Sequence, residues 1–240
     1  MDVLGFREPV SSWTHLTWML LAIPGLIPLW KAAGNDGLKR LGALVFGGTL
    51  IFCFAGSFLF HSVPATWVNL FRTMDHVGIF LLIAGTVTPI GLVVLDGWWR
   101  RGLVGGIWLL AGAGIAIRLR GPQPMIVMTT FYLFMGWVGC ATCCELARRL
   151  SFRGLFYLVM GGVFYTAGAI INCMHWLRPF PGIFEAHEIF HLFVMAGSLC
   201  HYLFIVQVVL PYQAGTLAEP DLRPLSLGFD HAKEGVVAIE

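Results

Sequence analysis

Long apolar stretches separated by short polar turns run along most of the chain. Seven stretches contain no Asp, Glu, Lys or Arg, and they cover residues 9–30, 41–60, 77–95, 102–117, 121–144, 154–177 and 189–218. A helix needs about 20 residues to cross a hydrocarbon layer of about 30 Å, and every stretch except 102–117 has close to that length. Interfacial residues on its two flanks lengthen this shorter stretch, namely Trp98, Trp99, Arg100 and Arg118. The pattern predicts seven transmembrane helices.

The composition supports the same class of protein. Hydrophobic residues make up 58% of the chain and charged residues 12%, whereas a soluble domain has about 25% charged residues. The apolar runs are uniform and lack the residue-by-residue alternation of membrane-spanning strands. A formal net charge of +2 is too balanced to indicate a nucleic-acid partner. We therefore expect an all-α integral membrane protein, with a seven-helix bundle over residues 1–210 and a polar, disordered tail over 211–240.

The positive charges predict an orientation in the membrane. Seven helices place the two ends of the bundle on opposite sides, which we call side A for the N-terminal side and side B for the other. Side A receives five Lys or Arg residues, and side B together with the tail receives ten. Internal loops carry the excess of Lys and Arg, so the N-terminus is expected outside and the C-terminus in the cytoplasm.

Six polar residues lie at helix ends, at positions where an apolar side chain would cost less free energy to place in the membrane. Ser57 and His61 end the second predicted helix, Asp75 and His76 open the third, and His187 and His191 open the seventh. The topology puts all three of these helix ends on side A. Residues four apart project from nearly the same face of a helix, so His187 and His191 can point together into the bundle. Ser57 and His61 can do the same.

This set of side chains suits a zinc ion. Three imidazoles from His61, His187 and His191 supply three nitrogens, and a catalytic zinc site needs that number plus an open position for water. Metals that prefer oxygen ligands are less suited to three imidazoles. Asp75 is expected at the same depth, and ionisable groups inside a membrane are usually functional.

The same residues also have simpler interpretations. A lone membrane histidine can form a hydrogen bond between helices, and Ser57 can bond to the backbone of its own helix. His76 points about 100° away from Asp75 on a helix of about 3.6 residues per turn. His201 lies roughly 15 Å deeper than His191, too far to share one ion with it. His175 is expected near a loop. Glu8 and His15 flank the start of the first helix, where they could contact the metal ligands or cover the site as a lid.

Three motifs together resemble one known family. They are Ser57-x-x-x-His61, the segment MDHVGIFLLIAGTVTPI from Met74, and FYTAGAI from Phe164 followed by HEIFHLFVMAGSLCHY from His187. These segments resemble the hemolysin III family of bacterial membrane proteins, within the progestin and adipoQ receptor group that includes adiponectin receptors. The chain is more distantly similar to the alkaline ceramidases. The resemblance implies a zinc ion held by His61, His187 and His191 with a water ligand, close to Asp75 and Ser57.

An N-terminal motif of this family is matched only in part. The family has glutamate, asparagine three residues later and histidine four further, and Glu8, Ser11 and His15 hold these places. Ser11 departs from the asparagine, and Pro9 directly follows the glutamate. The N-terminus of adiponectin receptors is cytoplasmic, which is the reverse of the orientation that the charges predict for this chain.

Two functions of different classes follow. The first is a zinc-dependent intramembrane hydrolase of lipid amide or ester bonds in the bacterial inner membrane, with Asp75 and Ser57 as catalytic residues and a membrane lipid as substrate. The second is a receptor or membrane-homeostasis protein in which a closed zinc site only joins helices. A pore-forming cytolysin is disfavoured because no helix carries the polar stripe of an ion path. A serine hydrolase is disfavoured because Ser57 lacks a G-x-S-x-G turn.

Overall fold

The structure is a computed structural model that describes residues 6–214, apart from the side chains of Cys140 and Arg153. Except for its first four residues, the predicted tail lies outside the described part of the chain, as does His231. The described helices are α1 (Pro9–Ala33), α2 (Gly37–Ser62), α3 (Val68–Pro89), α4 (Gly97–Leu119), α5 (Met125–Val138), α6 (Cys143–Arg149), α7 (Phe152–Met174) and α8 (Ala186–Phe204). Wider π-helical turns continue two of them, η1 (Ile90–Val94) after α3 and η3 (Ile205–Val209) after α8.

The prediction of an all-α membrane bundle is confirmed. Six helices are long and apolar enough to cross a membrane, and a bent pair formed by α5 and α6 brings the number to as many as seven. Within residues 6–214, extended pairing is limited to one antiparallel bridge, between Phe180 and Phe184. The shortest predicted stretch, 102–117, lies within α4. This helix begins at Gly97 and so includes the flanking residues Trp98 and Trp99, as expected.

The fifth predicted helix differs from expectation because it is broken. A bend of 40° separates α5 from α6, and a 3₁₀ turn, η2 (Gly139–Thr142), lies between them. The Thr142 hydroxyl donates a hydrogen bond to the Gly139 carbonyl at 2.7 Å. This tighter turn interrupts the α-helical hydrogen-bond ladder, so one apolar stretch yields two helices.

Short turns with local caps connect the helices. Asp36 caps α2 by accepting hydrogen bonds from the backbone of Leu38 and Lys39, and Ser151 caps α7 at the Gly154 backbone. Glu185 and Glu188 form a reciprocal capping box at the start of α8. Such caps satisfy amide groups that the first helical turn leaves free. The Glu185–Glu188 box fixes the first turn of α8, which carries His187.

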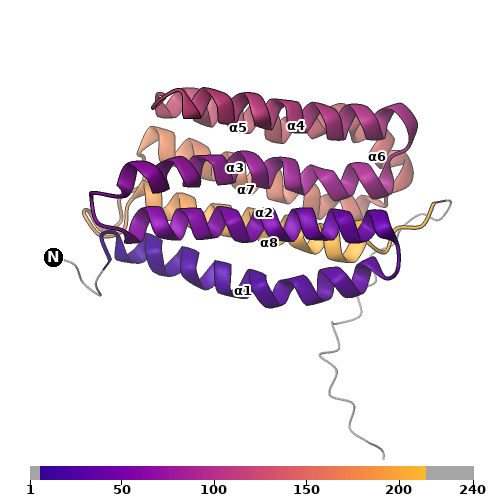
Figure 1. Cartoon of the computed structure of the whole chain (residues 1–240), viewed down its shortest axis with the longest axis horizontal. Coiled ribbons are helices and arrows are strands. Elements are labelled where there is room, and N and C mark those ends of the chain that lie inside the picture. The colour runs from indigo at the N-terminus through magenta and orange to yellow at the C-terminus, as the bar shows by residue number, and fades with distance from the viewer. Residues whose placement is uncertain (1–5, 215–240) are drawn as a thin grey trace, which may run out of the picture.

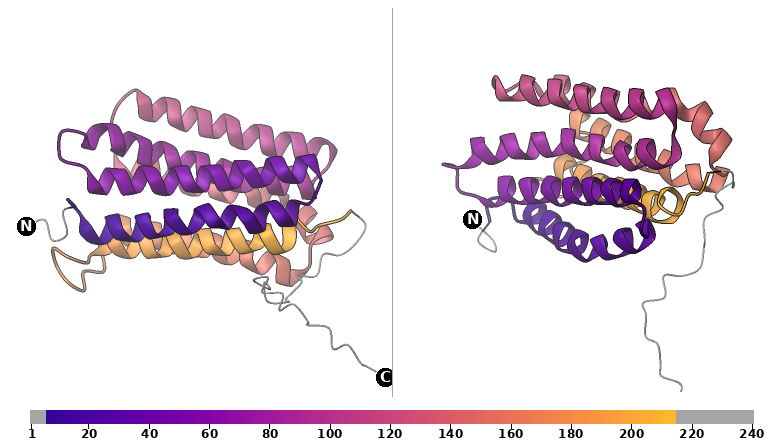
Figure 2. Two further views of the ribbon diagram at one scale, coloured as in Figure 1. Left: turned by 60° about the horizontal axis from the view of Figure 1, so that its bottom comes forward. Right: turned by 45° about the vertical axis from the view of Figure 1, so that its right-hand side comes forward.

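The helices lie side by side along one direction, with α4 and α5 on one edge of the bundle and α1 on the other (Figure 1). Helix α2 packs most extensively against α1 and α3, and α7 against α8. Helix α1 is bowed and contains Pro24 and Pro28, which remove backbone hydrogen bonds from its interior. The described chain begins at the side A end and finishes at the side B end (Figure 2).

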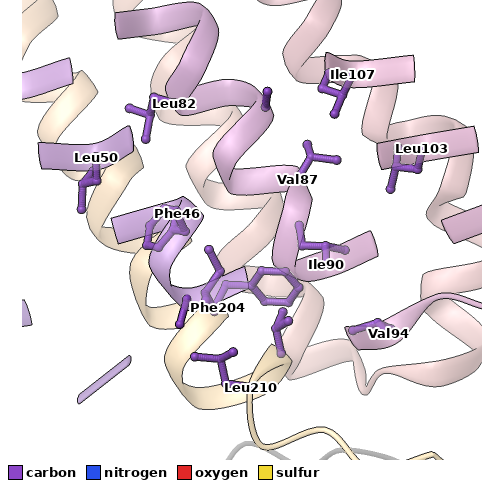
Figure 3. Close-up of a cluster of buried hydrophobic side chains, with 14 of the residues drawn as sticks. Phe46, Leu50, Leu82, Val87, Ile90, Val94, Leu103, Ile107, Phe204 and Leu210 are labelled. Carbon is purple, nitrogen blue, oxygen red and sulfur yellow. The ribbon is translucent and has the colours of Figure 1, made fainter. Parts of the chain in front are cut away.

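An apolar core fills the side B half of the bundle. Phe46 of α2, Ile90 of η1, and Phe204 and Leu210 around η3 converge there (Figure 3). Helices α2 and α3 approach closely at Gly42, where an added Cβ would lie 2.9 Å from the Pro89 Cα. The buried histidines His15, His61 and His191 lie beyond this core, at the side A end.

Candidate metal centre

Four histidines from three helices meet at the side A end of the bundle. His61 ends α2, His187 and His191 lie in the first two turns of α8, and His15 lies on α1. The ring centroids of the three predicted ligands are close together: His61 to His187 is 5.2 Å, His61 to His191 is 4.9 Å, and His187 to His191 is 4.4 Å. The structure thus brings together the three imidazoles that the sequence placed on side A.

His15 belongs to the same cluster. Its ring centroid lies 4.2 Å from that of His191 and 5.9 Å from that of His61. One nitrogen each from His15, His61 and His191 lies within 4.8 Å of the other two, and these three side chains are buried. Glu8, His61 and His187 form a second group with the same spacing. Both groups have donor atoms close enough to hold one metal ion.

Ser57 and Asp75 lie beside each other near this cluster. The backbones of α2 and α3 approach at Gly56, where an added Cβ would lie 3.3 Å from the Asp75 nitrogen. The Ser57 side chain lies next to the Asp75 carboxylate, and His61 is near enough to influence that carboxylate electrostatically. Glycine at position 56 therefore allows α3 to bring Asp75 alongside Ser57 of α2.

Hydrogen bonds orient two of the rings. His61 Nδ1 donates to the Glu8 carboxylate at 2.5 Å, and His187 Nδ1 donates to Asn172 Oδ1 at 3.3 Å. A neutral imidazole that donates from Nδ1 keeps the lone pair of Nε2 for a metal. Carboxylate and amide partners of this kind commonly orient metal-binding histidines.

Several buried nitrogens in the cluster have no hydrogen-bond partner among residues 6–214. They are His61 Nε2, His191 Nδ1 and both ring nitrogens of His15. Leaving a buried polar atom unpaired costs roughly 1–3 kcal/mol, so several in one place indicate that a ligand satisfies them. A metal ion fits, because each of these three imidazoles, when neutral, can offer the lone pair of one ring nitrogen.

The start of α1 is tied to both neighbouring helices. The Glu8 backbone donates to the His61 carbonyl at 3.1 Å, and Arg7 Nη2 donates to the Phe60 carbonyl at 2.6 Å. The Ser11 hydroxyl donates to Glu188 of α8 at 3.2 Å. Burial would raise the pKa of Glu8, but the hydrogen bond from His61 and the positive charge of Arg7 hold that pKa below its ordinary value. An ionised Glu8 is the state that accepts from His61.

The other singled-out histidines lie apart from the cluster. His76 accepts a hydrogen bond from Arg118 and so faces α4. His201 packs against α7, where its Nε2 donates to the Leu158 carbonyl at 3.2 Å, and a Cβ at Gly161 would overlap its ring. His175 ends α7 in the left-handed conformation, with a φ of 51°. Sequence reasoning gave Glu8 and His15 an outer role. The signals for a closer one were their spacing of seven residues and their partial match to the N-terminal motif of the family that the chain resembles.

Comparison with known proteins agrees with the motifs. Residues 5–202 match a family described as Haemolysin-III related, and this match covers most of the chain. The chain belongs to the hemolysin III family.

Relatives of this hemolysin III chain occur in bacteria and animals. It is 34% identical to Hemolysin-3 of Bacillus cereus over 209 residues, which are 85% of this chain and 93% of that protein. It is 32% identical to a Hemolysin-3 homolog of Bacillus subtilis (strain 168), with 83% and 93% of the two chains covered. Identity to an adiponectin receptor protein of Drosophila melanogaster is 26%, with 85% and 51% covered.

The contact between Glu8 and His61 leads to a prediction for metal binding in this hemolysin III protein. Glu8→Ala removes the acceptor that holds His61 Nδ1, so we expect metal affinity to fall by about 10–100-fold. Glu8→Gln keeps an acceptor oxygen and is expected to lose less. Titration of metal-free protein with zinc and a competing chelator measures both constants. Unchanged affinity in Glu8→Ala would show that Glu8 does not orient His61 for metal binding.

Proposed function

We propose that the chain is a zinc-dependent intramembrane hydrolase of lipid amide or ester bonds, with His61, His187 and His191 as the zinc ligands. The observation that supports this best is the gathering of imidazole nitrogens near side A, where buried nitrogens of His15, His61 and His191 lack partners among the described residues. His61 and His191 share one group of closely spaced donor atoms with His15, and His61 and His187 share a second with Glu8. Imidazole nitrogens suit zinc better than they suit magnesium or calcium, which prefer oxygen ligands.

The chemistry divides between the metal and two side chains. His61, His187 and His191 would hold the zinc ion, which would supply a water of lowered pKa (about 7 in such sites) and a Lewis acid for a carbonyl oxygen. Asp75 accepts and returns a proton, a role that its position beside Ser57 and near His61 supports. The Ser57 hydroxyl donates a hydrogen bond to Asp75 or to the substrate oxygen that gains negative charge. Glu8 and Asn172 hold the His61 and His187 rings in place.

A membrane lipid is the proposed substrate. The histidines stand at helix ends near side A, at the depth where an amide or ester bond next to a lipid headgroup would lie. A lipid amide is favoured by the distant similarity of the motifs to the alkaline ceramidases. We place the protein in the bacterial inner membrane, with side A outside, because side B carries the excess of Lys and Arg.

One observation favours a second candidate function. His15 supplies a fourth imidazole within reach of His61 and His191, and zinc with four protein ligands has no open position. In a receptor or membrane-homeostasis protein, such a site would join α1, α2 and α8 without catalysing a reaction.

Release of free fatty acid separates the two functions. Detergent-purified wild type, His187→Ala and His201→Gln are incubated with a panel of ceramides, N-acyl amines and lipid esters, and zinc content is measured on the same samples. A hydrolase is expected to release fatty acid in wild type and His201→Gln and to lose this activity in His187→Ala. Wild type that never exceeds the His187→Ala background on any lipid would contradict the proposal.

A further inference from the structure

A second cluster of polar side chains lies on side A, on the other face of α3. Arg118, in the last turn of α4, is 6% exposed, and its Nε donates to His76 Nδ1 at 3.1 Å. Its Nη1 reaches the Gly121 carbonyl at 3.5 Å. Arg72 precedes His76 by four residues and so projects from the same face of α3. The metal centre uses none of these side chains.

His76 does not balance the positive charge of this cluster. A guanidinium can only donate, so His76 Nδ1 must be the acceptor, and the ring proton is then on Nε2. His76 is therefore neutral in this arrangement. Its Nε2–H is a further hydrogen-bond donor on the ring that contacts Arg118.

No carboxylate of residues 6–214 lies within 4.0 Å of Arg72 or Arg118. Two other partly buried arginines do have such partners. Arg149 contacts Asp96 at 2.6 Å and Glu145 at 2.7 Å, and Arg7 contacts Glu8 at 3.1 Å. The carbonyls at the end of α4 offset the charge of Arg118 only in part.

The cluster has an accessible edge toward which an anion can approach. Arg118 Nη2 has no hydrogen bond to a described residue, and this atom remains accessible at the surface. The Arg72 side chain is exposed, and its guanidinium stacks 5.4 Å from the centroid of the Phe60 ring. The Tyr132 hydroxyl, donating to the His76 carbonyl at 3.3 Å, holds α5 against this part of α3.

We propose that Arg72, His76 and Arg118 bind the phosphate of a phospholipid headgroup. A guanidinium fork matches two phosphate oxygens, and His76 Nε2–H adds a third donor. The cluster lies near the start of α3 and the end of α4, at the membrane surface where lipid phosphates occur. Because His76 directly follows Asp75 but faces α4, the bound headgroup would lie across α3 from the metal centre. The proposal concerns binding and holds whether or not the metal centre hydrolyses lipid.

Lipid binding to delipidated, full-length protein tests this proposal. Native mass spectrometry and thermal unfolding are recorded with phosphatidylglycerol, with diacylglycerol of the same acyl chains, and with inorganic phosphate. Wild type is expected to retain and be stabilised by phosphatidylglycerol and not by diacylglycerol. Arg118→Gln keeps a donor for His76 but loses the charged fork, so its affinity for phosphatidylglycerol should fall about 10-fold or more.

Two further variants make the result specific. Arg72→Gln, at an exposed position, should weaken binding without risk to the core, and Arg101→Gln, at the side B end of α4, should leave it unchanged. Equal binding of diacylglycerol and phosphatidylglycerol would overturn the proposal. So would unchanged affinity in both Arg118→Gln and Arg72→Gln, or binding of inorganic phosphate without retention of the lipid.

Discussion

Replacing His61, His187 or His191 by alanine is expected to remove most of the zinc from a protein that otherwise holds close to one zinc per chain. Each change leaves only two of the three proposed protein nitrogens, and zinc needs at least three protein ligands for a stable site. Elemental analysis of purified wild type and variants, with protein measured on the same samples, gives the stoichiometry.

Three matched variants decide which nitrogens bind the ion. His201→Gln keeps the hydrogen bond to the Leu158 carbonyl, and His175→Asn suits the left-handed backbone at that position. Both should retain zinc. His15→Ala should also retain it if the proposed three ligands suffice, whereas loss of zinc in His15→Ala with retention in His187→Ala would replace His187 by His15. Equal loss in all variants would indicate unfolding and would refute the ligand assignment.

Asp75→Asn is expected to reduce hydrolysis of a lipid amide by about 100-fold or more while zinc stays bound. The substitution preserves the shape of the side chain and a partner for Ser57 but removes the base, and general acid–base catalysis commonly contributes at least that factor. The measurement is fatty-acid release under saturating lipid, with zinc content and the midpoint of thermal unfolding recorded on the same preparations.

A structural zinc site predicts a different outcome for Asp75→Asn. If the Asp75 carboxylate binds or anchors the metal, the change should lower zinc content or thermal stability instead. Zinc loss as large as in His187→Ala would make Asp75 a ligand and remove the open position that hydrolysis requires. Ser57→Ala provides the comparison, since it removes the neighbour of Asp75 without changing any proposed ligand.

The sequence by itself determined the class of fold and the end of the bundle at which the candidate site residues gather. Apolar length predicts each span because a bilayer has a fixed thickness, and the short stretch 102–117 became α4 (Gly97–Leu119) through its interfacial flanks. The order of the helices then placed His61, Asp75 and His187 at one end, because successive spans must cross in alternating directions. Four-residue spacing put His187 and His191 on one face of α8.

Only the tertiary structure decided which side chains meet at that end. Spacing along one helix does not fix how that helix is rotated or how deeply it lies against its neighbours, and those quantities depend on packing. The close contact at Gly56 brings Asp75 to Ser57, and the ties of Glu8 to α2 and of Ser11 to α8 bring His15 among the other imidazoles. The pairing of His76 with Arg118 arises in the same way. These arrangements depend on contacts between segments that are distant in the sequence, and no local pattern of apolar and polar residues records such contacts.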